Sequence, residues 1–551
     1  MRQLLVLVLV SAVGWGCAAK KPSASALEAA RLAREAAELK ALAGSRTLQG
    51  CYDCLLEAKA AYAKLATGTE RPQMLVRLFE TELLIALRER ELAIDAAPAI
   101  ARARALASEL PPALQAERYV KVVEAVPADS TGLPVAADIA FRRSKVQYVA
   151  GLDAEIVWLM GNAVAAQGTS AIENVLALPV RQYLALSLDC SYFRRARPPA
   201  PAPVAGLAAT PPVARQVVID QIPKDAPVLL QYRVGTCYDL RKPPLEAVRK
   251  EEPRYAEAAY FLARIDIARA NETGAPTARP LLAEAYGRFA NSPAVTYLAG
   301  NYNQLIGDCK AGLKYYDETV AIEPLHDNAL LGRTICLAFL KRFDESIASA
   351  TRMIAIPSTN LADAYYWRAW VRHYLKDLPL ARADIDQAKK ILSNNSIHRL
   401  AGIIEHDQDD LENADKDLTV AKSMTDGQYD CVARWYLGLN DMKRERWAVS
   451  AAHFEDAMGC YERAALFAQD GLRKMQAAEN VDPDFKARQI AGFEAAIKED
   501  TAQQYASAFN AANHYARAGD VTKAKALLGI AARDPALEPR VAELRKLLGG
   551  G

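Results

Sequence analysis

The sequence predicts an all-α protein, organised for most of its length as an α-solenoid of stacked antiparallel helix pairs. Its 551 residues are 51% hydrophobic, so the chain is long enough and apolar enough to bury a core. Only 7% of the residues are aromatic and alanine is abundant, a composition that suits closely packed helices and disfavours an all-β chain. Small residues also recur at an interval that fits one helical hairpin per repeat.

The first 17 residues are expected to be a targeting segment. Arg2 precedes an uncharged apolar run over residues 4–10, which small residues connect to Cys17. This order predicts a secretory signal peptide. A cysteine directly after a short apolar core resembles the signal of bacterial lipoproteins, and Gly16 fits that lipobox-like pattern. The resemblance implies that Cys17 becomes the first residue and carries a lipid, with ordinary cleavage near Ala19 as the alternative.

These features predict an exported protein of the periplasm or the cell outer membrane, attached to the membrane by its lipid anchor only. No later stretch reaches the roughly 20 apolar residues that a membrane-spanning helix requires. The charge is almost balanced, with 68 Lys and Arg against 66 Asp and Glu. Because no surplus of positive charge is present to neutralise phosphates, nucleic acid is not an expected partner.

Residues 18–126 predict an N-terminal helical region. Apolar residues at three- and four-residue spacing indicate helices over 26–40, 51–65, 73–91 and 97–110. Turns are expected between them at Gly44-Ser45, Gly68-Thr69 and Pro111-Pro112.

The next region, residues 127–254, is less regular. Its proline-rich segment, 195–214, cannot run as a helix and is expected to be a stiff linker or a long loop. Two short apolar runs follow, at 216–219 and 228–234. Both favour strands, although the second also fits a buried helix.

A repeat begins near residue 255. In each unit a small residue is followed by an apolar residue four positions later and by another small residue seven positions later. The first members of these sets stand 33 to 36 residues apart, at Ala278, Gly312, Ser346, Ala381, Ala414 and Ser450. After a gap of 74 residues, which accommodates two units if one is degenerate or lengthened, Ala524 starts another set. We therefore expect a repeat array over 255–464, and C-terminal helices over 465–551 that include one repeat at 505–536.

These units resemble the tetratricopeptide repeat. The closest matches are the segment 366–369 with 377–381, and the segment 436–438 with 454–457. In that family small residues lie where helix A of a pair crosses helix B, so that the two backbones approach closely. The resemblance implies a superhelix whose A helices line a concave surface, where a protein or an extended peptide binds.

The predicted binding residues are those spaced along one stripe of each helix A. They are Tyr297, Asn301, Asn328, Leu331, Tyr366, Trp370, His373, Tyr374, Arg399, Trp435 and Lys443. Trp, Tyr and Arg on an exposed groove are typical of binding hot spots. The alternative is that the aromatic residues fill the core between repeats.

Eight cysteines remain after Cys17, an even number that predicts disulfides in an oxidising compartment. The favoured pair is Cys431 with Cys460, because both lie at similar distances from a turn near Glu445 and would face each other on an antiparallel helix pair.

Two other cysteine pairs receive different predictions. Cys309 and Cys336 are offset around their turn by about 7.5 Å along the helix axis and are expected to be buried thiols. Cys51 and Cys54 have the spacing of a redox pair, but the strand, turn and helix of a thioredoxin-like site are missing around them. A structural role is therefore favoured for that pair.

No sequence motif indicates a catalytic or metal site. None of the six histidines belongs to a recognised metal-binding spacing, and the sequence has no nucleophile elbow, phosphate-binding loop or dinucleotide fingerprint. We therefore expect no catalytic residue, no metal and no cofactor.

The sequence favours a scaffold of the bacterial cell envelope that is not an enzyme and binds a protein or peptide partner. Two alternatives stay open. One is a glycan-binding outer-membrane lipoprotein similar to the starch-utilisation family, whose members stack aromatic rings on sugars. The other is a hydrolase with its site in residues 127–254, the least repeat-like region.

Overall fold

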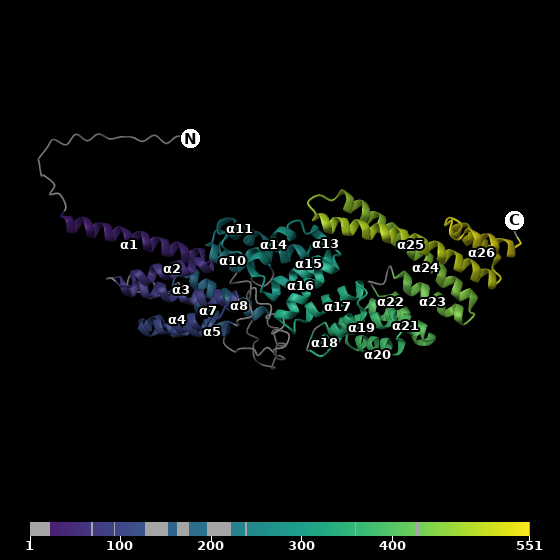
Figure 1. Ribbon diagram of the computed structural model, residues 1–551, viewed down its shortest axis with the longest axis horizontal. Helices are drawn as coiled ribbons and strands as arrows, with labels where there is room; N and C mark the ends of the chain where they lie inside the picture. The colour runs from purple at the N-terminus through teal and green to yellow at the C-terminus, as the bar shows by residue number, and fades with distance from the viewer. Residues whose placement is uncertain are drawn as a thin grey trace, which may run out of the picture.

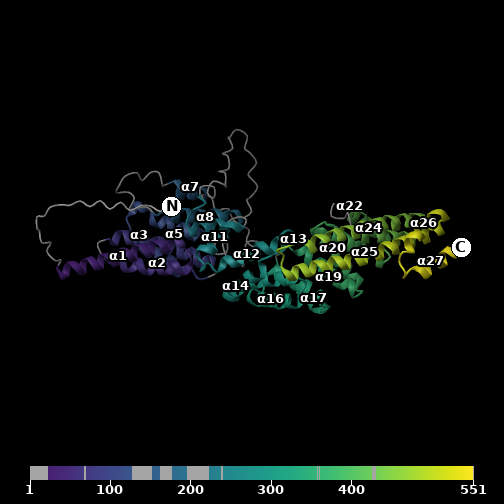
Figure 2. The same ribbon diagram turned by 90° about the horizontal axis from the view of Figure 1, so that it is seen from above.

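The computed structural model describes residues 23–67, 70–92, 94–126, 152–161, 176–194, 222–236, 240–356, 358, 360–424 and 430–549. Within these ranges the regular structure is helical and no strand occurs, as the fold class predicted. Cys17, the rest of the expected signal peptide and the proline-rich segment 195–214 lie outside them. No helix in the described ranges has the length and apolar character needed to cross a membrane. The molecule is elongated, with its N-terminal helices at one end and α26 and α27 at the other (Figures 1 and 2).

The N-terminal helices form a bundle. They are α1 (Ala24–Gln49), α2 (Tyr52–Leu65), α3 (Arg71–Glu91), α4 (Ala97–Glu109), η1 (Pro112–Leu114) and α5 (Ala116–Ala125), joined by α7 (Leu152–Gly161), α8 (Leu178–Arg194) and α10 (Val228–Thr236). One prediction is wrong here: helix α1 continues through the expected turn at Gly44 and ends at Gln49, before Gly50, where φ is 70°. Of the two interpretations left open for 228–234, a strand or a buried helix, the structure shows the helix: it is α10, whose Leu229 and Tyr232 are buried in the bundle.

The array that follows consists of antiparallel helix pairs, each with a helix A followed by a helix B. Short α11 (Lys242–Glu251) precedes them. The six consecutive pairs are α12 (Glu257–Ala268) with α14 (Ala278–Phe289), α15 (Pro293–Leu305) with α16 (Cys309–Ile322), α17 (Asp327–Phe339) with α18 (Phe343–Ile354), α19 (Leu361–Tyr374) with α20 (Leu378–Ile391), α21 (Asn395–Asp407) with α22 (Leu411–Ser423), and α23 (Cys431–Lys443) with α24 (Trp447–Ala477). The first pair also contains the short helix α13 (Ala270–Thr273) between its two helices.

The recurring small residues lie where helices cross. Tyr316, which is 1% exposed, has its ring between Gly300 of its own pair and Gly332 of the next helix A. A Cβ atom at Gly300 would lie 2.6 Å from that ring, and one at Gly332 would collide with it. Within the fourth pair Ala381, Ile385 and Ala388 are completely buried. Close approach of backbones therefore sets the geometry of the array, as the spacing predicted.

The turn from helix A to helix B also repeats. A residue with positive φ occupies the same place in successive pairs, at Gly307, Lys341, Lys376, Asp409, Glu445 and Gly519. An aspartate then begins helix B in several pairs. The side chain of Asp308, for example, accepts a hydrogen bond of 2.9 Å from the backbone of Ala311.

Two unusually long helices occupy the gap in the repeat. Helix α24 has 31 residues and α25 (Pro483–Arg517) has 35, and together they form one long hairpin. We call it the strap. The lengthening allowed for in this gap is present, in helix B of the sixth pair and helix A of the last pair, but no unit is added. Helix α25 pairs with α26 (Val521–Ala531), and α27 (Glu538–Leu547) ends the fold. In Figure 1 the strap runs back along the array towards α13 and α15.

Candidate functional site

The predicted binding residues lie on α15, α17, α19, α21 and α23, the A helices of five consecutive pairs. We call this surface the helix A row. Many of its side chains contact the next or the preceding helix A. The Tyr297 ring lies 4.9 Å from that of His326, and the Asn360 amide donates a hydrogen bond of 2.6 Å to Asn328. Leu331 packs against the small core cluster around Met353, whereas Asn301 is half-buried on α15.

Charged side chains also make contacts between neighbouring A helices. His373 Nε2 and Asp407 Oδ2 lie 2.9 Å apart. Arg399 Nη1 lies 3.6 Å from Asp430 Oδ2. Lys443 donates to the backbone carbonyl of His406 at 2.9 Å and to Asp409 at 2.6 Å. Several residues that the sequence assigns to partner binding thus also connect neighbouring repeats.

The electrostatics of two members follow from these contacts. Burial raises the pKa of the Tyr366 hydroxyl, against the opposing charge and hydrogen bond of Arg399. Burial also opposes ionisation of Asp407. The hydrogen bond from His373 and the charge of Lys376 outweigh it and lower the pKa of the Asp407 carboxyl. Asp407 is therefore charged at neutral pH.

Another part of the row, at α17 and α19, contains exposed aromatic side chains. Trp370 and Tyr374 stack with ring centroids 5.9 Å apart and an interplanar angle of 18°. The ring centroid of Trp367 lies 5.8 Å from those of Trp370 and Phe339. The ring centroids of Phe343 and Tyr374 are 4.9 Å apart. Phe339 is 61% exposed and Tyr374 is 52% exposed. We call these five residues, on α17, α18 and α19, the aromatic patch.

Sequence reasoning missed three residues of the patch: Phe339, Phe343 and Trp367. A signal for Phe339 was present, because it follows Leu331 by eight residues on the same helix, which is the stripe spacing already used for α19. Phe343 and Trp367 lie off that stripe. They join the patch only through the way α18 and α19 pack.

Trp435 has different surroundings. Its ring lies 5.0 Å from the ring of Phe454, at 78° to it, and Phe454 is fully buried. Trp435 also packs against the Cys431–Cys460 region, where the structure contains the disulfide that the sequence favoured. Trp435 therefore contributes to the core between α23 and α24. Trp370 is also half-buried and packs against the core cluster of α19, α20 and α21, whereas Tyr374, which stacks on it, is exposed.

The strap docks at its tip on the start of the array. The backbone of Asp482 donates to the Gly274 carbonyl at 2.8 Å, and the Tyr302 hydroxyl donates to the Asp482 carboxylate at 2.8 Å. Arg279 pairs with Asp484, and Phe485, 1% exposed, enters the core cluster of α12 and α15.

At the other end the two helices of the strap contact each other, where α24 belongs to the sixth pair and α25 to the last. Ser450 lies 2.8 Å from His514, and the Tyr515 hydroxyl donates to Glu455 at 2.8 Å. Between the two ends, residues 486–506 of α25 contain no buried side chain. The strap therefore links the first pairs to the last as a bridge. Figures 1 and 2 show it extending along α17 to α23.

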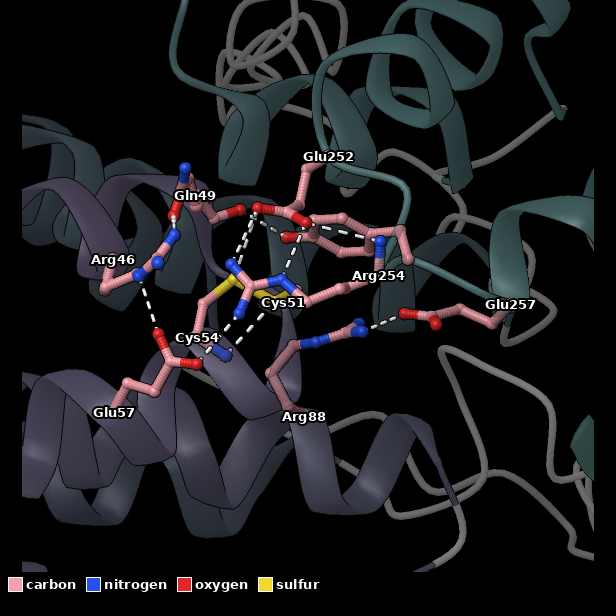
Figure 3. The surroundings of a disulfide bond; sticks show 10 residues. Arg46, Gln49, Cys51, Cys54, Glu57, Arg88, Glu252, Arg254 and Glu257 are labelled. Carbon is pink, nitrogen blue, oxygen red and sulfur yellow. Dashed lines mark hydrogen bonds and ion pairs between the residues drawn. A yellow bond between two sulfur atoms is a disulfide. The ribbon is translucent and has the colours of Figure 1, made fainter.

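A second notable cluster surrounds the Cys51–Cys54 disulfide (Figure 3). Cys51 begins helix α2, and both sulfur-bearing residues are at most 1% exposed. Glu252 approaches Cys54 Sγ at 3.6 Å and is held by Arg254 at 2.8 Å. That hydrogen bond lowers the pKa of the Glu252 carboxyl against the effect of burial.

The donor atoms of Cys51, Cys54 and Glu252 lie within 4.8 Å of one another, a spacing that could hold a metal ion. The disulfide removes both thiolates and Arg254 neutralises the carboxylate, so the oxidised cluster does not fit a cation. Its geometry fits the structural role predicted for the pair, joining α2 to the segment before α12.

Cys309 and Cys336 are free thiols in the structure. Cys336 is buried, as expected, but Cys309 is half-exposed. The predicted separation of the two is wrong: their Sγ atoms are 2.6 Å apart. Helices in a solenoid cross at an angle, so side chains at unequal distances from a turn can still meet. Cys237 and the side chain of Cys190 lie outside the described residues, as does much of the region proposed for a hydrolase site.

No protein-family model matches the chain and no curated protein matches it. Solved structures show weak similarity. YrrB, described as a tetratricopeptide repeat protein with an unusual peptide-binding site, is 14% identical, with 32% of this chain and 91% of YrrB covered and a TM-score of 0.28. A tetratricopeptide repeat protein from Parabacteroides merdae is 12% identical, with 53% and 99% covered and a TM-score of 0.32.

The Cut9–Hcn1 hetero-tetramer of the APC/C gives 12% identity, coverage of 87% of this chain and 96% of the other, and a TM-score of 0.36. Similarities at this level do not fix the arrangement of the pairs. The chain's own helix pairs and their small-residue crossings show an all-α solenoid.

Proposed function

We propose that this chain is a non-catalytic scaffold of the cell envelope that binds a protein partner, as an extended segment, at the aromatic patch of the helix A row. One observation carries the proposal: Phe339 and Tyr374 keep 61% and 52% of their surface exposed while Trp370 stacks beside them. Large apolar rings gathered on a surface typically mark interaction sites, and Trp and Tyr dominate binding hot spots.

The form of the partner follows from the surroundings of the patch. The A helices contact one another along the row, so the surface is long and continuous across repeats. The strap joins the first pairs of the array to the last. An extended polypeptide, rather than a globular domain, suits a long surface with a bridge beside it.

The test compares two double variants in affinity capture from envelope extract, followed by mass spectrometry. Phe339→Ala with Tyr374→Ala should remove the captured partner, while helical circular dichroism and the melting temperature stay unchanged because both side chains are exposed. Leu466→Ala with Leu547→Ala removes two exposed apolar side chains elsewhere, 58% and 76% exposed, and should capture normally. Equal capture by the patch variant and the wild type would refute the proposal.

The two tryptophans of the predicted stripe should behave differently. Trp370→Ala should weaken capture in a folded protein. Trp435→Ala should lower the melting temperature as well, because it removes the ring packed on Phe454. If both variants melt like the wild type, Trp435 is a surface residue and not part of the core.

A glycan ligand is the second candidate, favoured by the Trp370–Tyr374 stack, since parallel aromatic rings on a surface can pack against sugar rings. Binding to a glycan microarray that is lost with Tyr374→Ala would support it. Capture of a protein without any glycan signal would support the first proposal.

We also propose that the chain is exported and anchored by a lipid at Cys17. The support is the apolar run followed by a cysteine in the sequence. Cys17→Ser should move the protein from the membrane fraction to the soluble fraction. Continued recovery with the membranes would refute the anchor without affecting the binding proposal.

A further inference from the structure

The junction between the second and third helix pairs brings two cysteines into contact. Cys309 is the first residue of α16, and Cys336 lies near the end of α17. Their sulfur atoms are 2.6 Å apart, closer than two unbonded sulfur atoms normally approach. A disulfide needs an S–S bond of about 2.05 Å, so only a small shift of the side chains separates the observed contact from a bond.

We propose that Cys309 and Cys336 form a disulfide by exchange with a small-molecule or protein disulfide, and that this bond joins the second helix pair covalently to the third. The proposal rests on this geometry and does not depend on the proposed function. The same chain already holds two disulfides, Cys51–Cys54 and Cys431–Cys460.

The two cysteines differ in exposure and therefore have different roles in the exchange reaction. Cys336 is 0% exposed, whereas Cys309 is half-exposed and can meet an external disulfide. The hydrogen bond from Cys336 lowers the pKa of the Cys309 thiol, and the charge of Arg488 on the strap contributes in the same direction. The hydrogen bond to Cys309 and burial both raise the pKa of Cys336. Cys309 is therefore the attacking thiolate and Cys336 the resolving thiol.

The reaction proceeds in two exchanges. The Cys309 thiolate attacks one sulfur of the donor disulfide, forms a mixed disulfide and releases one donor thiolate. The Cys336 thiol loses its proton to solvent and attacks Cys309 Sγ, which releases the second donor thiolate. The two cysteines lose two electrons in total, and the donor disulfide gains them as it becomes two thiols.

The position of the bond gives it structural consequences. Gly307, two residues before Cys309, lies against the Arg488 side chain of the strap, where an added Cβ would be 2.8 Å from Cδ. Cys336 is three residues before Phe339 of the aromatic patch. Oxidation would thus fix the end of α17 that carries Phe339 to the helix that follows the docking site of the strap tip.

The test uses the full chain equilibrated with oxidised glutathione, denatured in N-ethylmaleimide without reductant, and digested with trypsin. Trypsin cuts between the two cysteines, after Lys310, Lys314 and Arg333. Mass spectrometry should find the Cys309 and Cys336 peptides linked, with two hydrogens fewer than the separate thiols. The Cys431–Cys460 link in the same digest is the positive control. Both Cys309 and Cys336 carrying N-ethylmaleimide while that link is intact would overturn the proposal.

Single variants test the order of attack. Cys336→Ser should accumulate the glutathione adduct on Cys309, because the resolving thiol is absent. Cys309→Ser should leave Cys336 unmodified in the folded protein, because it is buried. An adduct on Cys336 and none on Cys309 would overturn the assigned roles.

Discussion

The helical array and the N-terminal helices are stabilised by different kinds of contact. In the array, small apolar residues such as Ala381 and Ala388 are buried where two helices cross. In the N-terminal region, helix α3 buries charged side chains instead. Arg88 is 0% exposed, pairs with Glu91 and with Glu257 of α12, and lies over the Tyr232 ring at 4.4 Å.

This buried cluster is also where the two regions meet. Arg233 is completely buried, and its Nη1 lies 3.9 Å from Glu91 Oε1. Two arginines thus face two glutamates at the boundary between α3, α10 and the first helix of the array. Small-residue crossings recur through the repeats, whereas buried arginine–glutamate pairs join α3 and α10 to the first helix of the array, beside the apolar contact of Tyr232 with Tyr255. Four predictions test this contrast, from the largest expected effect to the smallest.

Removing the central cation should have the largest effect. Arg88→Met leaves Glu91 and Glu257 buried without their main partner and should lower the free energy of unfolding by about 3–5 kcal/mol. Urea unfolding followed by circular dichroism measures the change. Arg34→Met, which removes an exposed arginine paired with Glu38 on α1, is the matched control and should leave the unfolding curve unchanged. A small loss with Arg88→Met would show that packing, not charge, holds the boundary.

The two disulfides should differ in the same assay. Cys431 and Cys460 are 29 residues apart in sequence, whereas Cys51 and Cys54 are separated by 3. The longer closed loop restricts the unfolded chain more, so replacing Cys431 and Cys460 by serine should lower stability by about 2–4 kcal/mol. The same change at Cys51 and Cys54 should have a smaller effect. The reverse order would mean that the N-terminal bundle depends on its disulfide more than the array does.

The crossing points of the array tolerate no added bulk. Gly300→Ala places a methyl group against the Tyr316 ring, which cannot move away because Gly332 lies on its other side. We expect a loss of about 1–3 kcal/mol from this overpacking. Gly287→Ala on α14 has no heavy atom within 4 Å and should be neutral or slightly stabilising. Equal melting temperatures for the two variants would contradict the role of the crossings.

One buried acid in the array should produce a modest pH dependence. Burial, and then the neighbouring Asp417, raises the pKa of Glu405 to about 8 despite the charge of Arg382. Since the folded protein holds this proton between about pH 4.5 and 8 and the unfolded chain does not, stability should fall as the pH rises through that range. The slope is at most about 1.4 kcal/mol per pH unit, because a single proton is involved. Glu405→Gln should make the free energy of unfolding less dependent on pH in this range. An unchanged pH dependence in this variant would show that other groups cause it.

Much of the array could be predicted from the sequence because its contacts are periodic. The small residues at Gly312, Ala381 and Ala414 stand at the intervals that place them at helix crossings. The turns were less visible. Lys341, Lys376 and Glu445 adopt positive φ although their side chains give no signal for it, so only the glycines at 307 and 519 mark that position.

Contacts between distant segments could not be predicted. The strap docks through Asp482 on Tyr302, which lies 180 residues away in sequence. Arg88 and Glu257 are 169 residues apart. Neither pairing follows a local period, so no window of the sequence contains it. For the same reason Trp370 and Trp435 looked equivalent on their stripes, although only the structure shows that Phe454 covers one of them.

In a solenoid each repeat contacts only its neighbours, so small movements at every junction add up along the array. Helix α25 of the strap has 35 residues and is therefore about 50 Å long, and it connects the first pairs of the array to the last. The Asp482 and Phe485 contacts hold the tip of the strap on the first pairs, so a force that separates the two ends of the array acts on these contacts as well as on the junctions between repeats.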